Sequence, residues 1–399
     1  MKKLLKIAMA GLLLLPAHSC EKVDVVGVSP EEPPLPLPMP DTALYISAVK
    51  VPPDYDWRRD SAAGGAGCEL ILYRNMKPVA VYPTGADACI STDPDTHHII
   101  DGRLYTEFAT DSQTIIKRDG EEVLRYPGRE FLVGLLPSGN SIYTLGRLRG
   151  GGGYMLRKNG TLILEMEDCC VFGSFNASSY GTTGALYIDG GHSYFCYREP
   201  DGRCFKVRDG VPYPVKVPSS ASEVYDVKVH DGKEYLFYGA GLGTSHVKTP
   251  SKTIGLGNYS WVAAGMCFDQ GDICIMGFRI PHKILNVVFG GEPESVCQIL
   301  GGEVKKFSSG ADFIYCREKE IYAVCSRAGG LIVDDGDGPL LDIPLAYCFS
   351  RDCAVITDAG LCMGVTPRGG GRPYVILEGE DYPLDINGFI SSLGFCIKY

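Results

Sequence analysis

The strongest constraint on the fold of this chain is a strand pattern that returns eight times. Each unit contains a short strand, a tight turn, a second strand, a variable loop, a third strand, another tight turn and a fourth strand. A tyrosine or an apolar substitute marks the second strand of each unit, at Tyr45, Tyr105, Tyr143, Tyr194, Tyr235, Cys274, Tyr322 and Cys362. Successive marks lie about 45 residues apart, which is the period of a four-stranded propeller blade. The pattern therefore predicts an all-β protein, with residues 42–399 forming a single β-propeller.

The two ends of the repeat region predict how the ring closes. The first unit begins with a second strand at residues 44–46, and no first strand precedes it. The chain ends with an additional strand, residues 388–399, that has the form of a first strand. Pairing these ends would complete one blade and remove an exposed sheet edge. We therefore expect eight blades closed by the N- and C-terminal strands, with seven blades as the alternative.

Composition and charge restrict the class of protein further. The chain has 399 residues, of which 50 are glycine and 26 are proline, and this content disfavours long helices. Its 38 Lys+Arg residues against 48 Asp+Glu residues give a net charge of −10. Nucleic-acid binding depends on neutralising phosphates, so nucleic acid is excluded as an expected partner.

The first 41 residues indicate export and membrane anchoring. Three lysines precede an apolar stretch at residues 7–15, and a small residue, Ser19, precedes Cys20. This segment resembles a bacterial lipoprotein signal, which implies that residues 1–19 are a Sec-type signal peptide and that Cys20 carries the lipid. Residues 20–41 contain six prolines and are interpreted as an extended tether. No later apolar segment is long enough to span a bilayer, so the lipid is the expected membrane contact. The alternative is ordinary cleavage and release into the periplasm.

The repeats also resemble a known group of proteins. Second strands such as "SIYTL" followed by third strands ending in "RKNG" are similar to uncharacterised propeller lipoproteins of Bacteroidota. The resemblance implies a lipid-anchored location at the outer membrane, on its periplasmic or cell-surface side. Thr42 and Ser61 each follow an aspartate and resemble O-glycosylation sites of that phylum, with simple turn residues as the alternative.

Cysteines are abundant but do not form a metal-binding pattern. Fifteen cysteines follow Cys20, so complete internal pairing is impossible. We interpret most of them as small buried side chains, and neither a metal nor a cofactor is expected. Cys267 and Cys274 flank the Gln270-Gly271 turn, which places them across a hairpin as a candidate disulfide.

Motifs for catalysis are missing from the sequence. It contains no nucleophile elbow, phosphate-binding loop or zinc-binding helix. Two groups of ligand-type side chains are interpreted as turns between strands: Asp93, Asp95, His97 and His98, and Asp334, Asp335 and Asp337.

The loops between second and third strands are the predicted binding face. In a propeller they emerge on one side together with the connections between blades, and their summed charge is positive although the chain is acidic. Guanidinium groups suit carboxylate, sulfate or phosphate, and aromatic rings stack on sugars. The candidate ligand-binding residues are Trp57, Arg58, Arg59, Arg147, Arg149, Arg279, Arg368 and Arg372.

These observations predict a lipid-anchored cell-envelope propeller that binds an extracellular ligand, with an anionic glycan as the candidate. One alternative is a glycosidase or polysaccharide lyase with a site assembled from several blades. Another is a scaffold for a protein partner at the cell surface. In the absence of a catalytic motif, a non-enzymatic binding protein is favoured.

Overall fold

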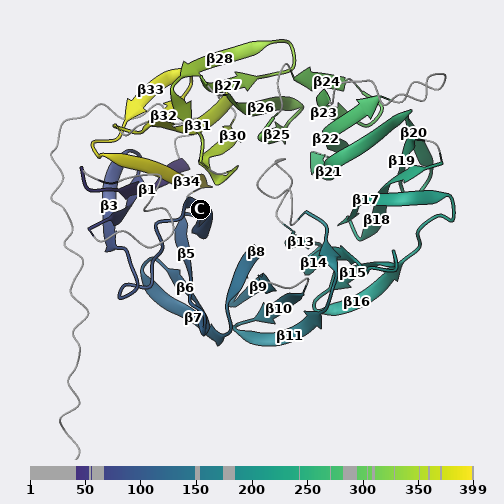
Figure 1. Cartoon of the computed structure of the whole chain (residues 1–399), viewed down its shortest axis with the longest axis horizontal. Helices are drawn as coiled ribbons and strands as arrows, with labels where there is room; N and C mark the ends of the chain where they lie inside the picture. The colour runs from purple at the N-terminus through teal and green to yellow at the C-terminus, as the bar shows by residue number, and fades with distance from the viewer. Residues whose placement is uncertain are drawn as a thin grey trace, which may run out of the picture.

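The strands of the protein form a ring of eight blades around a central axis (Figure 1). The computed structural model describes residues 42–53, 55, 67–148, 153–173, 185–241, 243–269, 271–281, 294–302, 304–307, 311–327, 329–349, 351–357, 360–368 and 371–397. Successive strands of a blade run from the axis to the rim, so first strands lie inside and fourth strands outside (Figure 1). The predicted all-β propeller with eight blades is confirmed, and the seven-blade alternative is not.

The first four blades are built from β1–β16 and the C-terminal strand. From the axis outward, blade 1 consists of β34 (Gly388–Ile397), β1 (Thr42–Lys50), β2 (Glu69–Arg74) and β3 (Lys77–Pro83). Blade 2 consists of β4 (His97–Ile100), β5 (Arg103–Ala109), β6 (Gln113–Arg118) and β7 (Glu121–Pro127). Blade 3 consists of β8 (Glu130–Ser138), β9 (Ser141–Leu148), β10 (Tyr154–Lys158) and β11 (Thr161–Met166). Blade 4 has a divided first strand, β12 (Cys170–Val171) and β13 (Tyr187–Asp189), followed by β14 (His192–Arg198), β15 (Cys204–Arg208) and β16 (Val211–Val215).

The other four blades complete the circle. Blade 5 consists of β17 (Ala221–His230), β18 (Lys233–Ala240), β19 (Thr244–Lys248) and β20 (Thr253–Gly257). Blade 6 consists of β21 (Tyr259–Asp269), β22 (Asp272–Pro281), β23 (Glu294–Ile299) and β24 (Val304–Phe307). Blade 7 consists of β25 (Phe313–Arg317), β26 (Glu320–Arg327), β27 (Gly330–Asp334) and β28 (Pro339–Pro344). Blade 8 again divides its first strand, into β29 (Ala346–Tyr347) and β30 (Ala354–Thr357), before β31 (Gly360–Pro367), β32 (Tyr374–Leu377) and β33 (Glu380–Pro383).

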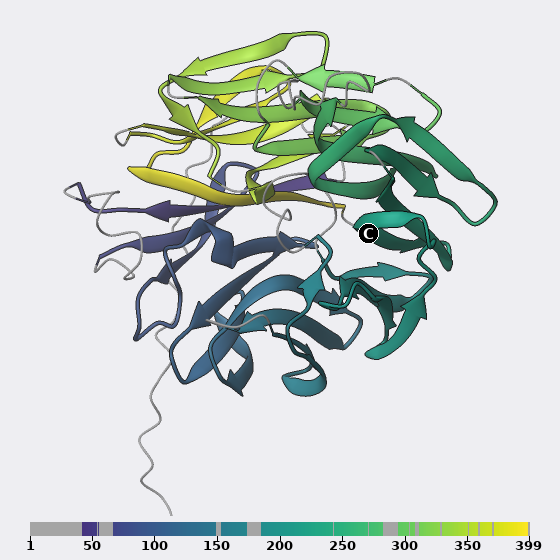
Figure 2. The same cartoon turned by 45° about the vertical axis from the view of Figure 1, so that its right-hand side comes forward.

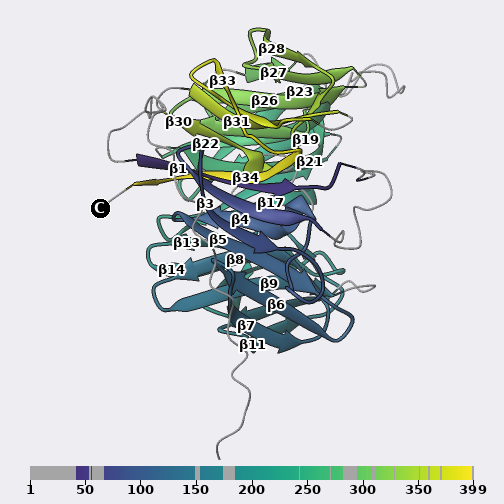
Figure 3. The same cartoon turned by 90° about the vertical axis from the view of Figure 1, so that its left-hand side faces the viewer.

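The ring closes through antiparallel pairing of β34 with β1, as the sequence predicts (Figures 1 and 3). The register runs from Thr42 opposite Ile397 to Lys50 opposite Gly388. The hydroxyl groups of Ser47 and Ser391 lie 2.9 Å apart in this buried seam. The last strand therefore supplies the innermost strand of the first blade, and the inner edge of β1 is paired instead of exposed.

A repeated side-chain contact explains why Asn and Asp recur in the turns between third and fourth strands. In blade 1 the side chain of Asn75 accepts a hydrogen bond from the Leu44 N–H at 2.8 Å, and in blade 2 Asp119 accepts one from Leu104 at 3.0 Å. Asn75 and Asp119 also have positive φ angles of 50° and 51°, which Asn and Asp tolerate better than most residues. One residue type thus forms the tight turn and satisfies a backbone donor at the start of the second strand.

The core lies mainly between neighbouring blades, where the faces of their sheets pack together. Leu44 and Ile46 of blade 1, for example, belong to the same buried cluster as Cys362 and Val365 of blade 8. Figure 2 shows the blades stacked around the axis in this way. Most of the fifteen cysteines after Cys20 are buried, in agreement with their interpretation as small core residues.

The predicted hairpin disulfide is not formed in this structure. Cys267 and Cys274 are opposite each other in the β21–β22 register, as the turn predicts. The Cys274 sulfur nevertheless lies against Cys316 of the next blade, at a distance of 3.3 Å.

Candidate functional site

Two short 3₁₀ helices approach the axis beside the closing strand. η1 (Pro94–Thr96) leads into β4 of blade 2, and η2 (Arg351–Cys353) leads into β30 of blade 8. Both helices contact β34, the innermost strand of blade 1. Side chains from three consecutive blades are therefore brought together at the ends of their first strands.

Local hydrogen bonds explain why the sequence around Asp93 forms a tight helical turn. The Asp93 carboxylate accepts from the Asp95 N–H at 3.1 Å, and the Thr96 hydroxyl donates to the Asp93 carbonyl at 2.7 Å. Pro94 occupies the first helical position, where its fixed φ is favourable. The interpretation of this segment as a turn is correct. The turn also places His97 and His98 at the start of β4.

His97 is a structural residue at the start of β4. Its side chain is fully buried, and its Nε2 donates to the Ser91 carbonyl at 2.9 Å. Burial lowers the pKa of His97 to about 4, so the ring is neutral at physiological pH. Its Nδ1 is buried without a hydrogen-bond partner among the described residues.

His98 points to the other side of β4 and pairs with a residue from another blade. Its Nδ1 donates to Asp352 Oδ2 of η2 at 2.9 Å, which joins blade 2 to blade 8. Burial opposes protonation, but the hydrogen bond and charge of Asp352, together with the charges of Glu107 and Asp95, raise the pKa of His98. The imidazole is partly exposed, at 24% of its surface, so a ligand can reach it.

Two further carboxyl groups near His98 have raised pKa values. Desolvation, reinforced by the charges of Asp93 and Asp352, raises the pKa of Asp95 to about 6. Desolvation also raises the pKa of Glu107, a buried residue of β5, to about 7. Glu107 accepts a hydrogen bond from the Leu132 N–H at 3.3 Å. We call Asp93, Asp95, His98, Glu107 and Asp352 the axial cluster.

A buried ion pair of blade 3 lies next to the axial cluster and packs against blade 2. Arg157 Nε and Nη2 donate to the same oxygen of Glu130, at 3.0 and 2.8 Å. The guanidinium group also lies 4.6 Å from the centre of the Tyr126 ring. The charge of Glu130 is among the causes of the raised pKa of Glu107, so this pair influences the cluster through electrostatics.

The axial cluster can accept hydrogen bonds and exchange protons. Its four carboxyl groups are faced by one imidazole, so its environment is acidic, and ionised carboxylates suit hydroxyl or ammonium donors. Asp95 and Glu107 titrate close to neutral pH, which is the range suited to acid–base chemistry. Clusters with such perturbed pKa values are characteristic of functional sites.

Several residues predicted to bind a ligand lie outside the part of the chain that the structure describes. These are Trp57, Arg58, Arg59 and Arg149, and the same holds for the lipidation residue Cys20 and the glycosylation residue Ser61. Thr42 is described, and its side chain is only 4% exposed within β1. A sugar transferase would therefore have little access to Thr42 in the folded protein.

The structure places two of the predicted arginines in ion pairs. Arg279 of β22 is buried, pairs with Glu294 at 3.0 Å and lies 4.2 Å from the centre of the Tyr259 ring. Arg372 is exposed and pairs with Asp385 at 3.1 Å. Each of these two guanidinium groups therefore has a carboxylate partner on the same blade.

The other two described arginines lie on different blades. Arg147 is part of β9 in blade 3, and Arg368 follows β31 in blade 8. The Arg368 guanidinium lies 4.3 Å from the centre of the Tyr347 ring. Arg368 and Arg372 share the β31–β32 loop, whereas Arg147 and Arg279 belong to two other blades.

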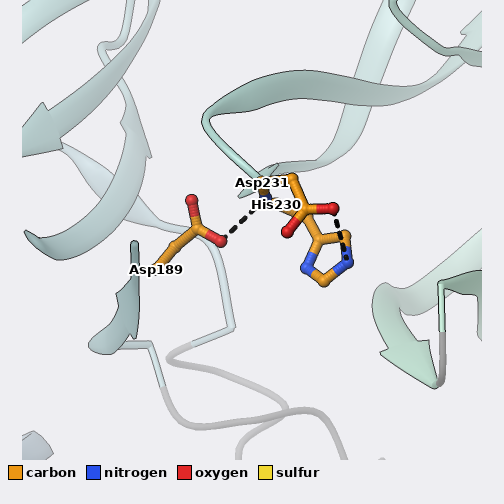
Figure 4. A group of neighbouring side chains, drawn as sticks. All are labelled: Asp189, His230 and Asp231. Atoms are coloured by element: carbon orange, nitrogen blue, oxygen red, sulfur yellow. Dashed lines mark hydrogen bonds and ion pairs between the residues drawn. The ribbon is translucent and has the colours of Figure 1, made fainter. Parts of the chain in front are cut away.

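A second group of ligand-type side chains occurs where first strands turn into second strands (Figure 4). One ligand atom each of Asp189, His230 and Asp231 lies within 4.8 Å of the others. Both oxygens of Asp189 accept backbone hydrogen bonds, from the N–H groups of Asp231 and Gly232 at 2.8 Å each. These contacts join the turn of blade 4 to that of blade 5, so the carboxylate has a structural role.

The second predicted acidic turn is also held by its own backbone. Asp334 accepts from the Gly336 N–H at 2.7 Å, and Asp335 accepts from the Asp337 N–H at 2.9 Å. The carboxylate of Asp337 pairs with Lys305 at 2.7 Å. The interpretation of this group as a turn agrees with these contacts.

Sequence reasoning identified Asp93, Asp95, His97 and His98 as a group but missed the residues that complete it. Asp352 lies 254 positions from His98, and nothing in its own segment indicates a functional role. Glu107 could have been suspected, because it is a charged residue between Thr106 and Phe108 in a second strand whose other residues are mostly uncharged.

Comparisons with known proteins extend the description of the fold only. No protein-family model and no curated protein matches the chain. Similar solved structures include dihydro-heme d1 dehydrogenase NirN in complex with DHE, with 12% identity, coverage of 88% of this chain and 75% of that chain, and a TM-score of 0.49. AztD from Citrobacter koseri has 10% identity, coverage of 89% and 98%, and a TM-score of 0.46. BamB from Moraxella catarrhalis has 10% identity, coverage of 75% and 84%, and a TM-score of 0.39.

Proposed function

We propose that the protein is a cell-envelope binding protein that holds a glycan at the axial cluster. The observation that carries this proposal is the His98–Asp352 pair, a partly exposed imidazole and carboxylate brought together from two blades at the axis. Groups of ionisable side chains with perturbed pKa values are characteristic of binding or catalytic sites.

The chemistry of the cluster favours a neutral or cationic glycan over an anionic one. Asp95 and Asp352 offer acceptor oxygens to sugar hydroxyl or ammonium groups, and their charge repels sulfate and carboxylate. Arg279 and Arg372, which the sequence assigned to an anionic ligand, have carboxylate partners of their own. An anionic glycan would instead rely on the other predicted residues, Trp57, Arg58, Arg59, Arg147, Arg149 and Arg368.

A thermal-shift screen tests the proposal. The probes are cello-oligosaccharides, chitosan oligosaccharides and heparin oligosaccharides, each at two salt concentrations. A ligand at 100 times its Kd stabilises the folded state by about 2.7 kcal/mol, which gives a measurable shift. We expect a shift with one of the first two probes that is lost in Asp352→Asn and retained in Arg372→Ala.

The same screen can contradict the proposal in two ways. A salt-sensitive shift with heparin that is lost in an Arg147→Ala/Arg368→Ala variant would move the site to the loops. The absence of a shift with every probe would exclude glycan binding of useful affinity by this chain.

The titration behaviour of Asp95 also favours a second candidate, a glycosidase or polysaccharide lyase. A carboxyl group with a pKa of about 6 can donate a proton near neutral pH, and the partly exposed His98 lies close enough to influence that pKa. Release of reducing sugars or unsaturated products by the purified protein, with loss of turnover in Asp95→Asn, would establish this function. Binding without turnover would leave the protein as a binding module.

We further propose that Cys20 is lipidated and anchors the propeller at the outer membrane through the residue 20–41 tether. In the described part of the chain, no helix has the length and apolar character needed to cross a bilayer. Metabolic labelling with a palmitate analogue tests the anchor. We expect label on the wild-type protein and none on Cys20→Ala, with the variant released from the membrane fraction.

A further inference from the structure

Four cysteine thiols meet at the boundary between blades 6 and 7. Cys267, Cys274 and Cys297 lie on β21, β22 and β23 of blade 6, and Cys316 lies on β25 of blade 7. The sulfur atoms of Cys274 and Cys316 are 3.3 Å apart. Cys267 and Cys297 belong to the same buried cluster as Cys274, and Cys316 packs against this cluster.

The four thiols differ in their access to solvent. Cys274 and Cys297 are completely buried and Cys267 is 8% exposed, whereas Cys316 is only partly buried. A dissolved reagent therefore reaches Cys316 before it reaches the other three. Cys316 can therefore react directly with a dissolved reagent, whereas the other three thiols can react only with one another or with Cys316.

The surroundings of Cys316 favour its reactive, deprotonated form. The thiols of Cys267, Cys274 and Cys297 donate hydrogen bonds to its sulfur and thereby lower the pKa of Cys316. The Cys316 thiol can also donate to the Asp269 carboxylate at 4.0 Å, and the charge of this carboxylate opposes formation of the thiolate. Asp269 is itself held in place by the Lys319 N–H at 2.8 Å.

We propose that Cys316 is a redox-active thiol that reacts with a small disulfide oxidant, and that Cys274 resolves the product into a disulfide between blades 6 and 7. In the first step the Cys316 thiolate attacks one sulfur of the oxidant, forms a mixed disulfide and releases one thiolate. In the second step Cys274 loses its proton and attacks the Cys316 sulfur, which releases the second thiolate. The two cysteines together lose two electrons and two protons, and the oxidant is reduced to two thiols.

The position of Cys274 makes it the preferred resolving residue. Its sulfur is already in contact with the Cys316 sulfur, and bond formation requires an approach from 3.3 Å to about 2.0 Å. Cys267 faces Cys274 within the same hairpin, so a bond between those two would leave blades 6 and 7 unlinked. The bond to Cys316 would instead join two blades of the ring.

Peptide mapping of the full chain tests this assignment. The protein is incubated with oxidised glutathione, its remaining thiols are blocked with N-ethylmaleimide in denaturant, and it is digested with trypsin without reduction. Cys267 and Cys274 share the tryptic peptide 253–279, Cys297 lies in peptide 284–305, and Cys316 lies in peptide 307–317. We expect peptide 253–279 to be linked to peptide 307–317.

Variants identify the role of each thiol. Cys316→Ser should abolish both the link and any glutathione adduct on peptides 253–279 and 307–317. Cys274→Ser should trap one glutathionyl group on peptide 307–317. Cys267→Ser is the matched control, because it changes a neighbouring thiol of the same cluster and should retain the link, which then identifies Cys274.

Two results with the wild-type chain would overturn the proposal. One is a disulfide within peptide 253–279 while Cys316 carries the blocking group. The other is blocking of all four cysteines after treatment with the oxidant. Both readouts use the wild-type protein, so they remain decisive if a serine variant fails to fold.

Discussion

Removing the C-terminal strand should abolish the stability of the whole ring, including blades far from the cut. Deletion of residues 387–399 removes three buried apolar side chains of β34, namely Phe389, Ile390 and Leu393. Burial of each contributes about 1.5–3 kcal/mol, so their loss costs about 5–9 kcal/mol before any effect on the partners in β1. The total stability of a folded domain is about 5–15 kcal/mol. The deletion is therefore expected to remove most of the free energy of unfolding.

Tryptophan fluorescence during urea unfolding measures this effect at a distance. In a Trp57→Phe background the single remaining tryptophan is Trp261, which is 3% exposed and donates to the Ser245 hydroxyl at 3.0 Å. Its strand, β21, lies across the ring from β34 (Figure 1). We expect Trp261 to be solvent-exposed in the truncated protein without urea, or to unfold at a much lower urea concentration.

A control variant lacks only residues 398–399, which follow β34, and should unfold like the intact chain. The reasoning would be refuted if Trp261 in the larger deletion showed the same unfolding midpoint as the intact protein. That outcome would mean that blades unfold independently, as repeats with nearest-neighbour stability do.

Three further predictions concern single side chains. The folded protein raises the pKa of Glu107 from 4.5 to about 7, so protonated Glu107 stabilises the fold fully below pH 4.5, and this contribution is lost as the pH rises through 7. The free energy of unfolding of the wild-type protein should therefore fall by up to about 3 kcal/mol between pH 5 and pH 8, and Glu107→Gln should remove this fall. A Cβ at position 388 would clash with the Val49 carbonyl oxygen, so Gly388→Ala should lower the free energy of unfolding in urea by at least about 2 kcal/mol. An unchanged unfolding midpoint would contradict this close packing of β34 against β1. Asp189→Ala should cost about 1–2 kcal/mol in the same assay because it leaves two backbone N–H groups without their acceptor, and added chelator should not change the wild-type value if the carboxylate is structural.

The predicted binding residues show where sequence reasoning is weakest. The sequence predicts Arg279 to lie in a long loop, whereas the structure places it near the end of β22, where it is buried and pairs with Glu294. Asp352 was not selected at all, although it pairs with His98. Both contacts were missed for the same reason: the partner of the charged side chain is in another strand or another blade, and a local pattern does not contain it.

The sequence by itself predicted the all-β propeller, the position of most tight turns and the closure of the ring, and it favoured eight blades over seven. These features depend on local chemistry that every repeat carries, such as the positive φ and side-chain acceptor of Asn75, and on a count of strands at the two ends. Only the tertiary structure decided which charged groups meet at the axis and which thiols meet between blades. Contacts such as His98–Asp352 and Cys274–Cys316 form because closure of the ring brings separate blades together, and their distances follow from the packing of whole sheets.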